Sequence, residues 1–245
     1  MLPEERPRSE HRGVVSRIQH YGCMEAFSKG VHRALVPLES NVSHVVAAEL
    51  VESSPGYGML TQMDILSFLR SHDNVLNDII SCSVEEMGAV NENVFSITTC
   101  SKVIDVLKSM SAASLRSVPI VEANGDAKDE DVLVHRKGRR LVGTFSATDL
   151  RGCPIGLLQS WLSLTITEFK EKGLMHCNTG IARKPRTLVS CYPETSLGQV
   201  MEEAMACHVH RVWVVDGQGL LVGLVSLSDM LRAIQESLLL AERES

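Results

Sequence analysis

Residues 210–229 read His-Arg-Val-Trp-Val-Val-Asp-Gly-Gln-Gly-Leu-Leu-Val-Gly-Leu-Val-Ser-Leu-Ser-Asp, and this run contains most of one structural unit. Residues 212–215 and 220–225 are apolar and of strand length, and Asp216-Gly217 between them is a strong two-residue hairpin signal. The final Ser-Leu-Ser-Asp predicts the start of a helix, because apolar residues then recur at helical spacing. A preceding helix is predicted over 197–205. The unit is therefore helix–strand–strand–helix.

The end of this unit occurs three times in the chain. An apolar strand, a glycine and then Ser/Thr-x-x-Asp are found at Gly58–Asp64, Gly143–Asp149 and Gly223–Asp229, which define a first, a second and a third copy. The aspartates are 85 and 80 residues apart. That period is too long for a solenoid repeat and fits a small αβ unit used three times.

The first and second copies repeat this order with different connections. Residues 124–140, between the strands of the second copy, are charged and rich in turn residues, which predicts a solvated loop. The first copy begins with weak periodicity, which predicts a short opening helix. The strands are predicted at 34–38 in the first copy and at 118–121 and 141–145 in the second, with helices that carry Met24 and Phe27 and the run Val103 to Met110.

Composition and charge exclude several classes of protein. Of the 245 residues, 44% are apolar and 22% are charged, which excludes a disordered chain, a collagen and a membrane bundle. The net charge of -6 gives no basic excess for nucleic-acid binding. The seven cysteines form no CxxC pair and the amino terminus has no secretory signal. We expect a cytoplasmic or nuclear protein with reduced thiols, and no nucleic-acid or membrane partner.

The repeated strand–turn–strand followed by Ser/Thr-x-x-Asp resembles the CBS (cystathionine β-synthase) domain. The run His210–Met230 is similar to the last CBS repeat in the γ regulatory subunits of AMP-activated and sucrose-non-fermenting-related protein kinases. Val31-His32-Arg33 resembles their second repeat, and Cys191-Tyr192 matches the strand that opens their fourth. The stretches Lys29–Asn41 and Val142–Cys153 resemble the plant γ-like branch. The resemblance covers residues 22 to 240.

The resemblance implies an α/β (α+β) fold of tandem CBS repeats: three βαββα-type units, the last two forming a pseudo-twofold pair. The family has four repeats, and its first repeat has no counterpart here. We therefore expect the first copy to expose an apolar helix face and to promote self-association. The implied organisation is a non-matching segment 1–20, CBS repeats at 21–72, 78–153 and 187–242, and a connecting helix and linker at 154–186.

The resemblance also implies a function and a set of site residues. The chain would be a non-catalytic γ-like subunit that partners kinase catalytic and β-type subunits, with AMP, ADP or ATP as regulatory ligand in the CBS clefts and no required cofactor. The cleft between the second and third copies is expected to dominate, with Asp229 at its edge. The ribose hydroxyls would be bound by Asp149, Asp229 and Asp64, and the phosphates by His32, Arg33, His210, Arg211, Ser226, Ser228 and Thr148.

Structural roles for the same residues remain open. Aspartates in a first helical turn stabilise the helix without any ligand, and a His-Arg pair is favourable wherever a helix ends. The second copy has Arg116-Ser117 where the others have His-Arg. Cys207-His208-x-His210 lacks a fourth metal ligand, and the sequence contains no nucleophile with a base or glycine-rich phosphate loop, so we expect neither a metal site nor an enzyme. The alternatives are a CBS scaffold with decayed nucleotide sites, or an accessory CBS module of an enzyme or transporter.

Overall fold

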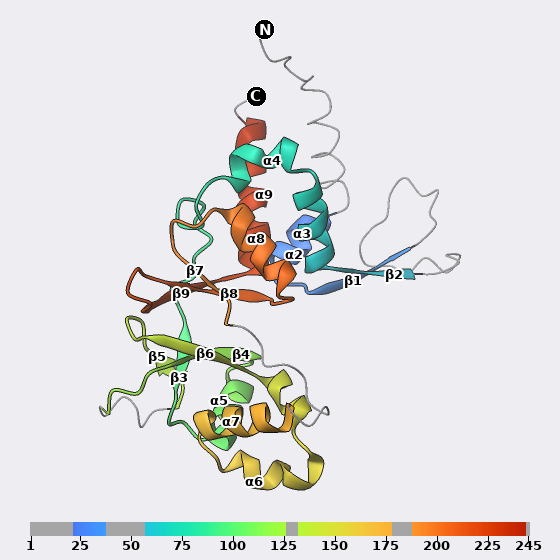
Figure 1. Ribbon diagram of the computed structural model, residues 1–245. Coiled ribbons are helices and arrows are strands. Elements are labelled where there is room, and N and C mark those ends of the chain that lie inside the picture. Colours follow the sequence, from blue (N-terminus) through green and yellow to red (C-terminus); the bar gives the residue numbers. More distant parts are fainter. Residues whose placement is uncertain (1–21, 38–56, 126–131, 178–187, 244–245) are drawn as a thin grey trace. The chain divides into compact units, whose positions relative to one another are not determined.

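The computed structural model describes residues 22–37, 57–125, 132–177 and 188–243 (Figure 1). The chain divides into two compact units. Unit 1 comprises residues 1–90, 194–212 and 225–245, and unit 2 comprises residues 91–193 and 213–224. The division crosses the third copy, because its strands β8 (Arg211–Val215) and β9 (Leu221–Ser226) each contribute residues to both units.

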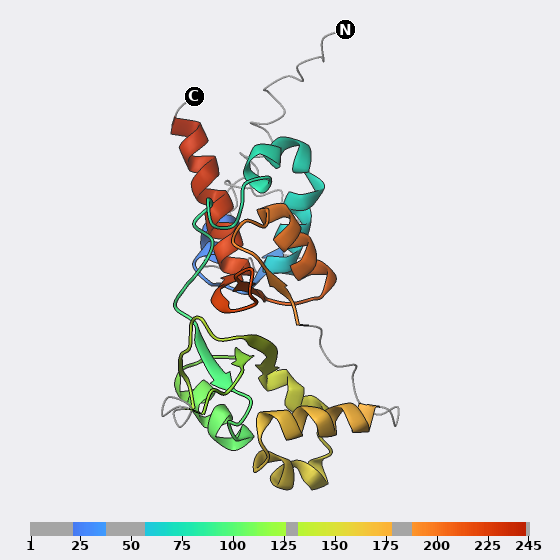
Figure 2. The same cartoon turned by 60° about the vertical axis from the view of Figure 1, so that its left-hand side comes forward.

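Unit 1 is built mainly from helices of the first and third copies. Helix α2 packs against α9, and α3 contacts both α8 and α9. Helix α9 lies beside α2 and α8 in Figure 1 and again in the view turned by 60° (Figure 2). Strands β1 and β2 pair antiparallel, with Arg33 opposite Thr61. The elements are α2 (Cys23–Ser28), β1 (Arg33–Pro37), β2 (Tyr57–Thr61), α3 (Gln62–Ser71), α4 (Asp73–Ile80), α8 (Leu197–Ala206) and α9 (Leu227–Arg243).

The apolar helix face that is expected to be exposed on the first copy is mostly buried, so that expectation is wrong, although Phe68 on α3 remains 43% exposed. Phe27, Leu66 and Leu69 are fully buried, because α2 and α3 pack against the helices of the third copy. Leu35 on β1 and Met59 on β2 are instead 62% and 60% exposed, and they are direct cross-strand partners. Among the described residues, the most exposed large apolar side chains of the first copy therefore lie on a sheet face.

Unit 2 contains the second copy and the hairpin of the third. Its four-stranded sheet has the order β5-β3-β4-β6, with β3 parallel to β4 and β4 antiparallel to β6. A second sheet has the order β7-β8-β9, with β7 parallel to β8. The elements are β3 (Phe95–Thr98), α5 (Val103–Ala112), β4 (Ser117–Val121), β5 (Val134–His135), β6 (Leu141–Ser146), η2 (Ala147–Gly152), η3 (Ile155–Leu157), α6 (Leu158–Leu162), α7 (Ile166–Cys177) and β7 (Ser190–Cys191).

The core of unit 2 has two parts. Phe145, Trp161 and Phe169 meet edge to face in one part, so helices α6 and α7 pack into the second copy. In the other part, Trp213 and Leu221 of the third copy pack with apolar residues of the second, and the Trp213 indole Nε1 donates a hydrogen bond to Thr144 Oγ1 at 2.6 Å. The strands of the last two copies thus pack together, but α9 of the third copy packs against α2 and α3 of the first, which the expected pairing of the last two copies does not include.

The segment 124–140 is only partly the solvated loop that its charge predicts. Residues 126–131 lie outside the described residues. The rest is structured: Val134 and His135 form β5, and Arg136 is only 3% exposed. The Arg136 guanidinium donates to the carbonyl of Ser96 at 2.5 Å, and the Gly138 amide donates to the carbonyl of Leu221 at 2.8 Å. Carbonyls of neighbouring strands thus satisfy polar groups that composition alone assigns to water.

The element that follows the repeated motif differs between the copies. It is a ten-residue α-helix in the first copy and a seventeen-residue α-helix in the third. In the second copy it is a 3-10 helix of six residues, and Pro154 follows shortly after it. Residues before a proline are disfavoured in α conformation, so the helix predicted after Asp149 ends early. Within the described ranges, no helix combines the length and apolar character that a bilayer crossing requires.

Candidate nucleotide-binding site

The Ser/Thr-x-x-Asp motif forms a capping box in the first and second copies, and the same contacts occur in the third. In the first copy, Asp64 Oδ2 accepts from the Thr61 amide at 2.8 Å and from the Thr61 hydroxyl at 2.7 Å. In the third, Asp229 Oδ2 accepts from the Ser226 amide at 3.0 Å and from its hydroxyl at 2.5 Å. Asp149 Oδ2 accepts from the Ser146 amide at 2.9 Å. One carboxylate oxygen in each copy therefore stabilises a helix start.

The second carboxylate oxygen, Oδ1, has different surroundings in Asp64 and in Asp229. Asp229 Oδ1 accepts from the Arg232 guanidinium at 2.7 Å, and the residue is only 6% exposed. The expectation that Asp229 lies at the edge of a cleft is therefore wrong. Asp64 is exposed, and its Oδ1 has no partner among the residues that the structure describes. Asp64 is thus the better placed of the two to accept from ribose hydroxyls.

A buried glutamine connects predicted phosphate-binding residues of two copies. Gln62 is 2% exposed, and its Oε1 lies 3.0 Å from His32 Nδ1. Its Nε2 donates to the Phe27 carbonyl at 3.0 Å and to Ser228 Oγ at 2.8 Å. His32 comes from the loop before β1, and Ser228 from the first turn of α9. His32 and Ser228, which are 196 positions apart in the sequence, therefore share one amide.

The cations of unit 1 lie beside the same helix starts. The carbonyl of His210 accepts from the Leu227 amide at 3.2 Å, at the first residue of α9. Arg211 is partly buried, and burial lowers the pKa of its guanidinium. Arg33 stands opposite Thr61, which caps α3. The predicted site residues of unit 1 are His32, Arg33, Asp64, His210, Arg211, Ser226, Ser228 and Asp229.

Thr148 and Asp149 belong to unit 2, where the cation beside them is one that sequence reasoning missed. Lys170 on α7 donates through Nζ to the Thr144 carbonyl at 3.0 Å. Burial lowers the pKa of Lys170, and the charge of Asp149 partly opposes that shift. Burial raises the pKa of the Cys153 thiol, and Asp149 raises it further. No sequence signal marks Lys170, because it lies outside the repeated motif.

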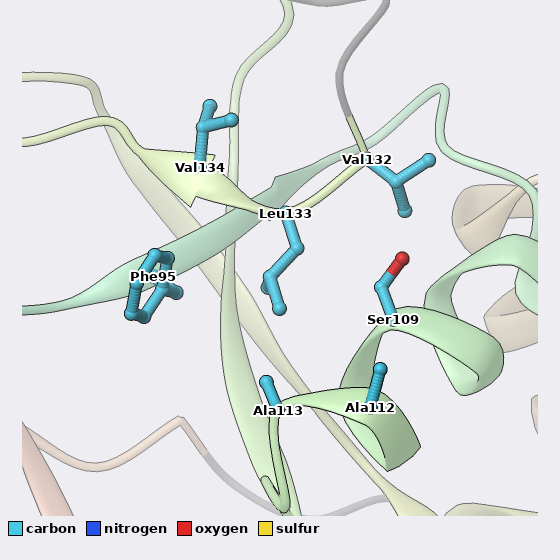
Figure 3. A pocket seen from close by; sticks show the side chains of 7 residues that line it. All are labelled: Phe95, Ser109, Ala112, Ala113, Val132, Leu133 and Val134. Atoms are coloured by element: carbon cyan, nitrogen blue, oxygen red, sulfur yellow. The ribbon is translucent and has the colours of Figure 1, made fainter.

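A hollow of about 620 Å³ lies elsewhere in unit 2, between α5 and β5 (Figure 3). Among the described residues that line it, Ser109 has the only side-chain hydroxyl and none is charged. It does not fit a nucleotide and contains no predicted site residue. Among the described residues, no three His, Cys, Asp or Glu side chains gather as metal ligands would. The lining residues are Phe95, Ser109, Ala112, Ala113, Val132, Leu133 and Val134.

Comparison with known proteins shows which proteins the chain is similar to. Residues 184–236 match the family model of the CBS domain. The chain is 44% identical over 219 residues to the SNF1-related protein kinase regulatory subunit gamma-like PV42b of Arabidopsis thaliana, which is 89% of this chain and 61% of that protein. It is also 44% identical to PV42a of the same organism, over 88% of this chain and 60% of that protein. The chain thus spans about three-fifths of the length of these relatives.

More distant relatives point the same way. The 5'-AMP-activated protein kinase subunit gamma of Saccharomyces cerevisiae is 27% identical over 72% of this chain and 48% of its own length. Two solved structures have a similar fold: MJ1225 of Methanocaldococcus jannaschii (TM-score 0.55, 16% identity, 86% of this chain and 63% of that one) and a conserved protein of Pyrococcus horikoshii (TM-score 0.57, 15% identity, 86% and 73%). The chain carries a CBS domain and, over most of its length, resembles the plant gamma-like regulatory subunits of SNF1-related protein kinase.

Proposed function

We propose that the chain is a non-catalytic, gamma-like regulatory subunit of an SNF1-related protein kinase, and that it binds an adenine nucleotide in unit 1. The names of the Arabidopsis relatives support the kinase role, and the name of the yeast relative supports a link to AMP. The site consists of residues that flank the starts of α3 and α9, from the first and third copies. This replaces the cleft between the second and third copies that the sequence favours.

The observation that carries the nucleotide proposal is the shared contact of His32 and Ser228 with Gln62. The contact places an imidazole and a hydroxyl from two copies around one point, next to the starts of two helices. Backbone amides at a helix start and the helix dipole favour a phosphate there. The exposed oxygen of Asp64 on α3 supplies an acceptor for ribose hydroxyls.

Calorimetric titration with AMP, ADP, ATP and adenosine tests the nucleotide proposal. The His32→Ala variant is expected to bind AMP at least about tenfold more weakly, because a hydrogen bond to a charged group contributes about 1.5–3 kcal/mol. Its affinity for adenosine should not change. Leu174→Ala, an exposed position on α7 in unit 2, is the matched control. Equal losses of AMP and adenosine binding in His32→Ala would contradict the phosphate assignment.

A scaffold without nucleotide binding is the second candidate, and Asp229 favours it. Both of its carboxylate oxygens are held within the third copy, by Ser226 and by Arg232. A scaffold would give no heat with any of the four ligands and no rise of melting temperature. It would still assemble with its kinase partners.

The proposed partners are the catalytic and β-type subunits of the kinase. Co-expression of the full chain with both subunits, followed by affinity purification through the catalytic subunit, measures assembly. We expect the chain to be recovered in a defined ratio. Recovery no greater than that of an unrelated CBS protein would contradict the regulatory role.

Self-association is proposed through the face that Leu35 and Met59 form. Aligned on the His-Arg pair, Leu35 corresponds to Trp213 of the third copy, and aligned on the repeated motif, Met59 corresponds to Thr144 of the second. Trp213 and Thr144 are bonded to each other where the third copy packs on the second. In the second and third copies, the strand positions equivalent to this face are therefore covered by each other. A second copy of the chain offers such a face to the first copy.

A further inference from the structure

Gln62 is the first residue of α3, and it has no counterpart in the other copies, where Ala147 and Leu227 occupy the same position. We propose that Gln62 is a positioning residue. It sets which ring nitrogen of His32 carries the proton, and it turns the Ser228 hydroxyl into a donor for an anion held by the first and third copies. The inference rests on the proposed nucleotide site and names the residue that orients its polar groups.

The orientation of the Gln62 amide follows from its contact with Phe27. A backbone carbonyl can only accept a hydrogen bond, so the amide nitrogen must face the Phe27 carbonyl, 3.0 Å away. The amide oxygen then faces His32 Nδ1. Because Gln62 is buried, reversing the amide would leave two buried oxygens facing each other without a hydrogen. The amide is therefore locked in one direction.

The locked amide fixes the tautomer of His32. The oxygen of Gln62 carries no hydrogen, so the 3.0 Å contact requires that Nδ1 of His32 donates. The Nε2 nitrogen is then the one that is not committed to Gln62. His32 is exposed, and it has no other partner among the described residues. In this tautomer Nε2 carries no hydrogen, so in its hydrogen bond with a phosphate a protonated phosphate oxygen donates.

The same amide sets the direction of the Ser228 hydroxyl. Ser228 Oγ accepts from Gln62 Nε2 at 2.8 Å, so its own proton must point away from Gln62. No acceptor for that proton is present within the described part of the chain. The hydroxyl is thus a donor for a phosphate oxygen. One buried side chain thereby sets the hydrogen-bonding roles of two groups from different copies toward the same anion, with His32 Nε2 as an acceptor and the Ser228 hydroxyl as a donor.

Nitrogen-15 NMR of the His32 ring tests the tautomer without any nucleotide. At a pH where the imidazole is neutral, two-bond ¹H–¹⁵N correlations of the full chain should show Nδ1 protonated, with the signal assigned by its loss in His32→Ala. In Gln62→Met, which has a similar shape and no amide, the ring should move toward the Nε2-protonated form. Protonation at Nε2 in the wild-type chain, or the same tautomer in Gln62→Met, would overturn the proposal.

Ser228→Ala is the matched variant, and it keeps the test decisive if Gln62→Met does not fold. It removes the hydroxyl and leaves the contacts of Gln62 with Phe27 and His32, so the tautomer should stay as in the wild type. By calorimetry both variants should bind AMP at least about tenfold more weakly, with adenosine affinity unchanged. Unchanged AMP affinity in either folded variant would overturn the anion role of Gln62. If the wild-type chain binds no AMP, the proposed nucleotide site fails, and the NMR result alone decides the tautomer.

Discussion

At the scale of single residues, equivalent positions in the copies differ in chemistry because their neighbours differ. Asp64 and Asp229 both cap a helix, but only Asp229 has an arginine one turn further along the helix. Arg232 donates to Oδ1 of Asp229, whereas the equivalent oxygen of Asp64 remains exposed. The repeated motif therefore predicts the cap in each copy, and the neighbouring residue determines whether an oxygen remains for a ligand.

Asp229→Ala is expected to lower the free energy of unfolding by about 1–3 kcal/mol, because it removes the bonds to Ser226 and leaves Arg232 without its partner. Asp64→Ala should lower the free energy of unfolding by less, because that residue is exposed. It should also weaken adenosine binding. Urea unfolding and calorimetry measure the two effects. A smaller loss of stability in Asp229→Ala than in Asp64→Ala would contradict the assigned roles.

Lys170 gives a pH dependence whose sign follows from its environment. Burial lowers its pKa in the folded chain, so between that lowered pKa and the ordinary value near 10.4 the unfolded chain binds more protons. The free energy of unfolding of the wild-type chain, relative to that of Lys170→Met, should therefore rise with pH through this window. Below the window, the full cost of burying the charged lysine is present. Urea unfolding from pH 7 to pH 10.5 measures this difference. Lys172→Met, at an exposed lysine, is the control, and a flat difference for Lys170→Met would refute the effect.

At the scale of elements, local signals were sufficient for some features and not for others. The two strands of the third copy and the helix starts could be predicted, because caps and apolar periodicity act over a few positions. The predicted two-residue turn at Asp216-Gly217 is wrong, since residues 216–220 connect the strands. The burial of Arg136, the contact of Lys170 with Thr144 and the bridge of Gln62 to Ser228 depend on residues 26 to 166 positions away. No local pattern contains them. The candidate site could thus be predicted by residue type, but not by partner.

The cap of α3 allows a stability test within one element. Thr61→Ala removes the hydroxyl that bonds Asp64, and a lost N-cap costs about 1 kcal/mol. Ser67→Ala, at an exposed position inside the same helix, should instead raise the free energy of unfolding by up to about 0.5 kcal/mol, because alanine is the better helix former. Urea midpoints of both variants give the comparison. Equal midpoints would argue against the capping box.

At the scale of the whole molecule, the helices of the first copy are covered by the third, while its two-stranded sheet keeps an apolar face. A two-stranded sheet alone is marginally stable, so a covering partner would also stabilise the strands. The self-association proposed above therefore links assembly to the order of β1 and β2.

Sedimentation velocity over a range of concentrations tests this link. The wild-type chain should show a dimer that grows with concentration, and Leu35→Lys with Met59→Lys should shift it to monomer because two like charges would be buried without an acidic partner. Leu174→Glu, at an exposed leucine of α7, should behave as the wild type. A wild-type monomer at all concentrations, or a dimer that both double and control variants keep, would refute this interface.

The third copy contributes residues to both units, and this limits how the gene can be shortened or recombined. The chain moves between the units at residues 90/91, 193/194, 212/213 and 224/225, so neither unit is a continuous stretch of sequence. Gene truncation, exon loss or fusion acts on continuous stretches. A gene that lost everything after residue 193 would encode two incomplete cores rather than one intact unit. Keeping both cores intact therefore requires that all three copies are inherited together, because the third copy completes the core of each unit.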